Sequence, residues 1–197
     1  MSQRVDINEK YNERRDGLDQ NWMDFLLRTG VIPILVPNNR LVVEHLLEAV
    51  AVDGILLTGG NTPVAYGGNA TERDMVDTAL LDYATQYAVP LIGVCRGMQS
   101  IAIYFGATLK KVEGHVGTRH KVNGENVRLV NSYHQLAIDR NTPVLDILSM
   151  SEDKEIEVVA HKHLPILGMM WHPEREQPFD RHDIRLFKEM WGRGGGV

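Results

Sequence analysis

The segment that decides the fold runs from residue 89 to residue 100 and reads VPLIGVCRGMQS. Its first part, VPLIGVC (89–95), is a short apolar run of the kind found in parallel strands that are buried on both faces. Residues 97–105 then show helical spacing and stop at Gly106. The segment therefore predicts a strand, a sharp turn and a helix, with the thiol of Cys95 at the turn.

Similar units precede this segment. Apolar runs at 31–36 (VIPILV) and 54–58 (GILLT) predict two more strands. Apolar residues at helical spacing predict helices over 17–29, 40–50 and 71–87. Strands that alternate with helices in this way predict an open α/β sheet with right-handed crossovers.

The second half of the chain changes character. Short segments over 107–137, separated by glycines, predict strands and hairpins that project from the main sheet, and EIEVVA (155–160) predicts a strand. PILGMMW (165–171) predicts the last buried strand, and 180–191 a terminal helix. We expect an open, mostly parallel sheet with helices on both faces and a small β excursion. It would form one domain over 1–191, with a disordered tail at 192–197.

Length, charge and cysteine count exclude several classes of protein. The chain has 197 residues, a formal charge of −5 and one cysteine, which excludes an intrachain disulfide framework and a multi-cysteine metal site. The acidic balance argues against binding a nucleic-acid polymer, which needs an excess of Lys and Arg. No apolar run approaches the length of a membrane span, and the polar start has no signal-peptide pattern. We expect a cytoplasmic protein that contacts no membrane.

The neighbours of Cys95 favour a nucleophile over a buried structural thiol. Gly93 and Gly97 permit a sharp turn that exposes the side chain at the carboxyl edge of the sheet, as in a nucleophile elbow. The helix N-terminus favours the thiolate, and the backbone N–H of Arg96 would face a developing oxyanion.

A thiol nucleophile needs a base, and His172 directly follows the last apolar strand. Parallel strands end at one edge of a sheet, so His172 would emerge beside Cys95. Glu174 would point the same way and orient the imidazole. The Gly59-Gly60 turn ends another strand at this edge, and its N–H groups are a second candidate oxyanion donor.

Together these motifs resemble the class I glutamine amidotransferase family, which has a flavodoxin-like α/β fold. The resemblance covers essentially the whole chain and rests on 57–60 (LTGG), 93–99 (GVCRGMQ) and 171–174 (WHPE). Two more segments, 71–74 (TERD) and 131–135 (NSYHQ), look like the free-standing γ-glutamyl hydrolase branch, which includes enzymes that cleave γ-glutamyl-γ-aminobutyrate.

The resemblance implies a Cys-His-Glu triad and a γ-glutamyl thioester intermediate. Cys95 would attack the γ-carbonyl, His172 would transfer the proton and Glu174 would orient it. The backbone N–H groups of Gly60 and Arg96 would form the oxyanion hole. The α-amino and α-carboxylate groups of the glutamyl moiety would be held by Gln99, Asn131, Ser132, Tyr133 and His134.

The leaving group is suggested by the start of the chain. Residues 2–16 look like the start of enzymes that hydrolyse γ-glutamyl-CDP-amidate in the biosynthesis of capsule phosphoramidate. Arg4, Arg14 and Arg15 would then contact a diphosphate. From the residues alone, a solvated charged loop over residues 2–16 is as good an interpretation as a diphosphate site. Family members normally begin with an apolar strand before this segment, and here that strand is short or missing.

Other functions stay open. A glutaminase subunit would need a separate synthetase chain, because no synthetase domain fits into 197 residues. A non-enzymatic regulator is disfavoured by the intact set of Cys95, His172 and Glu174. A metal site at His115 and His120, or at His161 and His163, lacks carboxylate or cysteine support in the sequence, so we expect neither metal nor cofactor. The expected partner is a small γ-glutamyl substrate, and a homodimer remains open.

Overall fold

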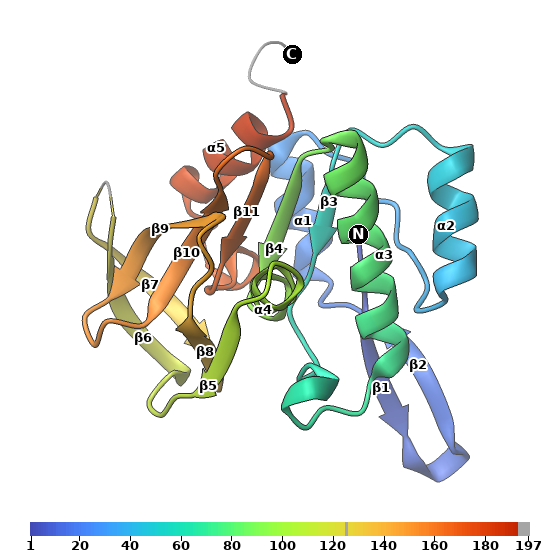
Figure 1. Ribbon diagram of the computed structural model, residues 1–197, viewed down its shortest axis with the longest axis horizontal. Coiled ribbons are helices and arrows are strands. Elements are labelled where there is room, and N and C mark those ends of the chain that lie inside the picture. Colours follow the sequence, from blue (N-terminus) through green and yellow to red (C-terminus); the bar gives the residue numbers. More distant parts are fainter. Residues whose placement is uncertain (125, 193–197) are drawn as a thin grey trace.

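The computed structural model describes residues 1–124 and 126–192 (Figure 1). Its α-helices are α1 (Asn21–Thr29), α2 (Arg40–Ala49), α3 (Thr71–Tyr87), α4 (Arg96–Tyr104) and α5 (Arg181–Met190). Its strands are β1 (Arg4–Asn8), β2 (Glu13–Gly17), β3 (Ile55–Leu57), β4 (Leu91–Val94), β5 (Thr108–Lys111), β6 (Val116–Asn123), β7 (Arg128–Tyr133), β8 (Leu136–Arg140), β9 (Leu145–Ser151), β10 (Ile156–His161) and β11 (Ile166–Met169). Of the tail expected to be disordered, residues 193–197 lie outside the described residues.

Seven strands form one mixed sheet in the order β3-β4-β11-β10-β9-β6-β7. The first three are parallel, and each later pair is antiparallel. The α/β fold class is confirmed, but the parallel part has three strands, so the antiparallel part is larger than the small excursion we expected. The reason is the short connection from β10 to β11, residues 162–165, which forces an antiparallel pair and joins the excursion to the main sheet.

Helices cover both faces of the parallel part of the sheet (Figure 1). On one face, α1 and α5 pack Phe25 and Phe187 against alternate strand residues such as Ile92. On the other face, α2, α3 and α4 pack against the intervening residues, among them Leu57 and Leu91. This alternation explains why β3 and β4 read as continuous apolar runs, since both faces of each strand are buried.

The strand predicted over 31–36 is wrong. These residues form no assigned strand, although Val36 donates a backbone hydrogen bond to Met1 (3.0 Å) and the amino group of Met1 donates one to Ile34 (2.6 Å). Ser2 in turn donates to Leu56 of β3 (2.9 Å). Met1 and Ser2 therefore lie between β3 and residues 34–36.

Residues 4–17, where the sequence analysis predicts no strand, form the hairpin β1–β2. Both strands carry mostly exposed side chains, and the hairpin projects from the body of the molecule (Figure 1). Strand β9 was also not predicted from the sequence. In the described part of the chain, no helix is long and apolar enough to cross a membrane.

Candidate active site

Cys95 occupies a sharp turn between β4 and α4. Its backbone has φ 52° and ψ −103°, a conformation rare for a residue with a side chain. Its N–H donates to the carbonyl of Met169 (2.7 Å), which ties the turn to the end of β11. The flanking glycines are required by close packing. A Cβ at Gly93 would lie 2.6 Å from the backbone of Gly97, and a Cβ at Gly97 would lie 2.1 Å from the carbonyl oxygen of Leu57.

Gly60 and Arg96, whose backbone N–H groups are the expected oxyanion donors, both line the pocket of the thiol. Arg96 is the first residue of α4, and N–H groups in the first turn of a helix have no partner within the helix. Gly60, with φ 108°, lines the same pocket as Cys95. The positive end of the α4 dipole also lies at the thiol, where it favours negative charge. The turn thus combines a thiol with candidate donors for an oxyanion.

His172 follows β11 at the same edge of the sheet. Its Nδ1 lies 2.7 Å from Oε1 of Glu174, and both side chains are buried. Burial lowers the pKa of His172, but the charge of Cys95, a hydrogen bond to its sulfur and the contact with Glu174 together raise that pKa to about 9. Gly59 makes room for the ring, because a Cβ there would lie 2.4 Å from Cε1 of His172.

Asn131, on the edge strand β7, bonds to the backbone of His172. Its Oδ1 accepts from the N–H of His172 (2.9 Å), and its Nδ2 donates to the carbonyl of His172 (2.8 Å). Nδ2 also donates to Glu176 (2.7 Å). Asn131 is buried, so these bonds are shielded from water. The structure therefore shows Asn131 as a support for His172.

A buried ionic cluster lies under the glycine turn and was missed by the sequence analysis. The guanidinium group of Arg73, on α3, donates to the carbonyls of Thr58 (2.6 Å) and Gly59 (3.0 Å). The side chain of Arg96 pairs with Asp77 from the same helix. Burial lowers the pKa of both guanidinium groups to about 9, and the carboxylate of Asp74, on α3, opposes that shift in each. Arginines in the first turn of a helix are common on protein surfaces. The sequence around Arg73 therefore gave no sign that its side chain is buried under the glycine turn.

The thiol opens into a pocket of about 320 Å³. Among its lining residues are Cys95, His172, Arg4, Gly60, Asn61, Arg96, Gln99, Tyr133, His134 and Arg175. The side chain of Arg175 stacks on the ring of Tyr133, with 4.4 Å between its Cζ and the ring centroid. Gln99 donates to the carbonyl of Leu136 (3.1 Å), which fixes its amide in the pocket wall.

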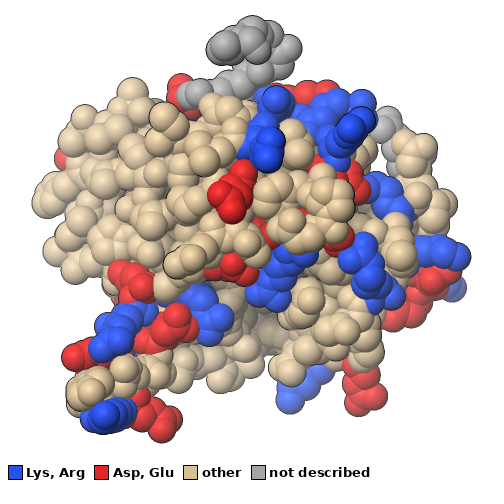
Figure 2. All heavy atoms as spheres, turned by 180° about the vertical axis from the view of Figure 1, so that it is seen from behind, with Lys and Arg blue, Asp and Glu red and all other residues tan. Residues whose placement is uncertain are grey.

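The other residues expected to bind substrate lie away from this pocket. The hydroxyl of Ser132 donates to the carbonyl of His115 (2.7 Å). Arg14, on the hairpin, pairs with Glu72 (2.5 Å), and Arg15 pairs with Glu13. Figure 2 shows acidic and basic side chains intermixed on this hairpin, at the lower left, so its positive charges have acidic neighbours.

The fold and this edge of the sheet define an α/β protein with a thiol elbow paired to a histidine and a carboxylate. The family model for glutamine amidotransferase class-I matches residues 13–189. The chain belongs to that family.

Two relatives and one solved structure give the context. The chain is 30% identical to a γ-glutamyl-CDP-amidate hydrolase from Campylobacter jejuni, over 97% of this chain and 96% of the relative. It is 27% identical to a γ-glutamyl-γ-aminobutyrate hydrolase from Escherichia coli O157:H7, over 80% of this chain and 78% of the relative. A protein from Thermoplasma acidophilum that is named as a component of GMP synthase has the same fold. Its TM-score is 0.70 at 23% identity, over 88% of each chain.

Proposed function

We propose that the chain is a cysteine hydrolase that cleaves a γ-glutamyl amide bond through a γ-glutamyl thioester and releases glutamate. The observation that carries this proposal is the meeting of Cys95 with the His172–Glu174 pair in one pocket. Two relatives named as hydrolases of γ-glutamyl compounds support the type of bond.

In the first step, the sulfur of Cys95 attacks the γ-carbonyl carbon of the substrate. The carbonyl oxygen takes the electron pair and accepts hydrogen bonds from the backbone N–H groups of Gly60 and Arg96. Because Nδ1 of His172 contacts Glu174, its exchangeable proton is on Nε2. That proton goes to the leaving nitrogen as the C–N bond breaks and the thioester forms.

In the second step, His172 is neutral and accepts a proton from water, and the resulting hydroxide attacks the thioester carbon. The C–S bond breaks, glutamate leaves, and Cys95 returns as the thiolate beside an imidazolium. A histidine pKa raised to about 9 suits this cycle, since the resting pair is then charged at neutral pH. Glu174 keeps the ring in one orientation in both steps.

The glutamyl group and the leaving group have different candidate contacts. We assign the α-amino and α-carboxylate groups to the wall formed by Gln99, Tyr133 and His134, which lines the pocket. For the leaving group we favour cytidine diphosphoramidate, released from γ-glutamyl-CDP-amidate. The similarity to the Campylobacter jejuni enzyme supports this choice over the whole chain, and Arg4 in the pocket offers a cation for the diphosphate. Such an activity belongs to capsule biosynthesis in the cytoplasm.

The test is a comparison of glutamate release from four substrates. These are γ-glutamyl-CDP-amidate, γ-glutamyl-γ-aminobutyrate, a γ-glutamyl polyamine and glutamine, with kcat/KM measured for each. We expect the highest value for γ-glutamyl-CDP-amidate and no turnover of any substrate by Cys95→Ala. Glutamate release by that variant would contradict the role of Cys95.

The second candidate function is hydrolysis of γ-glutamyl-γ-aminobutyrate, favoured by the 27% identical relatives. The same assay separates the two, since a preference for that substrate would overturn our choice of leaving group while keeping the cysteine mechanism. Turnover of glutamine alone, stimulated by a second chain, would instead indicate a glutaminase subunit.

A further inference from the structure

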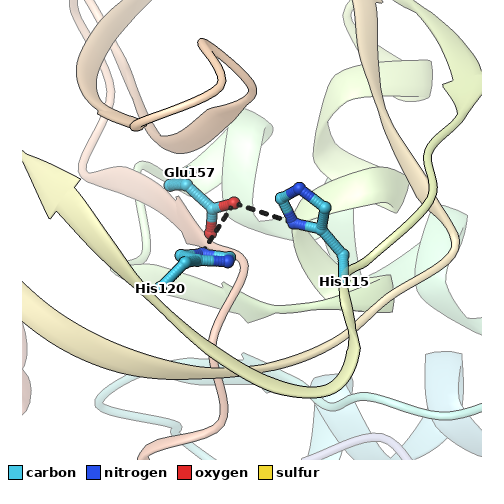
Figure 3. A group of neighbouring side chains, drawn as sticks. All are labelled: His115, His120 and Glu157. Atoms are coloured by element: carbon cyan, nitrogen blue, oxygen red, sulfur yellow. Dashed lines mark ion pairs between the residues drawn. The ribbon is translucent and has the colours of Figure 1, made fainter.

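Two histidines that the proposed mechanism does not use, His115 and His120, lie with His134 of the pocket wall around one buried carboxylate. His115 precedes β6, His120 lies on β6, His134 follows β7, and Glu157 lies on β10. Figure 3 shows His115 and His120 pointing at the carboxylate of Glu157 from two sides. The antiparallel extension of the sheet thus brings together residues that are up to 42 positions apart.

The nitrogen and oxygen atoms of this cluster are close to one another. From Oε1 of Glu157, Nε2 of His120 is 3.2 Å away, Nε2 of His134 is 3.4 Å away, and Nδ1 of His115 is 3.8 Å away. The near nitrogens of His115 and His134 are 3.1 Å apart. One ligand atom from each of His115, His120 and Glu157 lies within 4.8 Å of the other two.

The carboxylate at the centre is buried without well-formed hydrogen bonds. Glu157 is 0% exposed, and neither of its oxygens has a hydrogen-bond partner of good geometry among the described residues. A buried carboxylate in this position is costly unless a cation or better donors compensate it.

The far nitrogens of two rings are already used. Nε2 of His115 lies 2.8 Å from the carboxylate of Asp153, and Nδ1 of His134 lies 3.2 Å from the carbonyl of Leu136. Both partners only accept hydrogen bonds, so both far nitrogens carry the proton. In neutral rings the near nitrogens then present lone pairs to each other at 3.1 Å. Either an additional proton or a metal ion must lie in that region.

The geometry points to a divalent transition-metal site of the zinc class, with His115, His120 and Glu157 as ligands and His134 as the fourth. Ligands at the usual Zn–N and Zn–O distances of about 2.0–2.1 Å in a tetrahedron are about 3.3 Å apart. Four of the six separations within this set lie between 3.1 and 3.8 Å, near that value, and the ligand nitrogens of His115 and His120 lie within 4.8 Å of each other. The bonds to Asp153 and to the carbonyl of Leu136 are the outer contacts that orient metal-binding histidines.

Four protein ligands leave no open position, so the ion would be structural. It would tie together β6, β10 and the segment after β7. His134 belongs both to this site and to the pocket wall beside Cys95, so the ion would also fix that wall. The sequence analysis expected no metal because the carboxylate that supports His115 and His120 is far away in the chain.

The test measures zinc binding directly and does not depend on activity. All proteins carry Cys95→Ser, which removes the thiolate as a competing zinc ligand. Each is dialysed against zinc, passed through a desalting column and analysed by elemental mass spectrometry. Affinity follows from competition with a chromophoric chelator. We expect about one zinc per chain, and, with cobalt, the visible absorption bands of a tetrahedral complex.

Variants locate the ion. His120→Asn, at a partly exposed position, should weaken zinc affinity by at least about 100-fold, since even an outer contact typically contributes 10–100-fold. Glu157→Gln should do the same, and if this buried change prevents folding, His120→Asn still decides the question. The matched control is His163→Asn, an exposed histidine that should keep the zinc. Retention of less than about 0.1 zinc per chain, or equal affinity in His120→Asn, would overturn the proposal and leave a proton between His115 and His134.

Discussion

The contact between Asn131 and His172 gives the sharpest prediction. Asn131 both accepts from the N–H and donates to the carbonyl of His172, at 2.9 and 2.8 Å. Asn131→Ala removes both bonds: it leaves the buried N–H of His172 unpaired, and the carbonyl of His172 keeps only the N–H of Arg175 (3.1 Å). The unpaired N–H costs about 1–3 kcal/mol and the lost bond to the carbonyl about 0.5–1.5 kcal/mol, so we expect the free energy of unfolding to fall by about 1.5–4.5 kcal/mol. A reacting group displaced by about 1 Å loses about 100-fold in rate, so kcat should fall by a similar factor.

The assay pairs urea unfolding with steady-state glutamate release. The matched control is Asn141→Ala, because Asn141 donates a single side-chain bond, to the carbonyl of Leu145 (2.8 Å), outside the pocket. That variant should lose only about 0.5–1.5 kcal/mol and keep its kcat. Asn131→Asp should be as inactive as Asn131→Ala, since a carboxylate cannot donate to the carbonyl of His172.

The outcome decides between two roles for this side chain. The family resemblance implies that Asn131 binds the glutamyl group, whereas the structure shows it supporting His172. If Asn131→Ala raises KM while kcat and stability stay unchanged, the positioning argument is refuted and substrate binding is the better explanation.

Three further predictions concern the turn, the base and the leaving group. Gly97→Ala should abolish soluble expression or lower Tm sharply, because its Cβ would lie 2.1 Å from a carbonyl oxygen of β3. Glu174→Gln removes one of the groups that raise the pKa of His172 to about 9, so His172 should lose its proton at lower pH. The basic limb of the kcat/KM profile should then move to lower pH. An unmoved limb would show that Glu174 does not set the pKa of His172. Arg4→Ala should raise KM for γ-glutamyl-CDP-amidate more than Arg14→Ala does, since Arg4 lines the pocket and Arg14 does not. An equal effect of the two changes would contradict the assignment of Arg4 to the diphosphate.

The local parts of the fold were predictable because they depend on neighbouring residues. The helix over 71–87 was predicted with the observed bounds, and the turn at Cys95 followed from its two glycines and the apolar strand before it. The strand over 31–36 was wrong, because apolar residues predict burial and extension but not a pairing partner. Here the backbone partner is Met1, which bonds to Ile34 and Val36.

Distant contacts decided which polar residues share a site. The sequence placed His172 beside Cys95 because parallel strands end at one edge, and this inference needs only strand order. It treated Asn131 and His134 alike, although one holds the backbone of His172 and the other lies between the pocket and the histidine cluster. Asn131 lies on β7, whereas His134 follows the end of that strand. The sequence of this segment does not show where the strand ends.

The sequence by itself determined the α/β class, the thiol elbow and its paired histidine, because glycine spacing and apolar runs act within a few residues. Only the tertiary structure decided what surrounds them. Arg73 lies under the glycine turn, Asn131 bonds to the backbone of His172, and Glu157 lies among three histidines. Each of these is a contact between groups far apart in the chain. Its strength comes from burial that removes water, and burial exists only once the sheet and helices have packed.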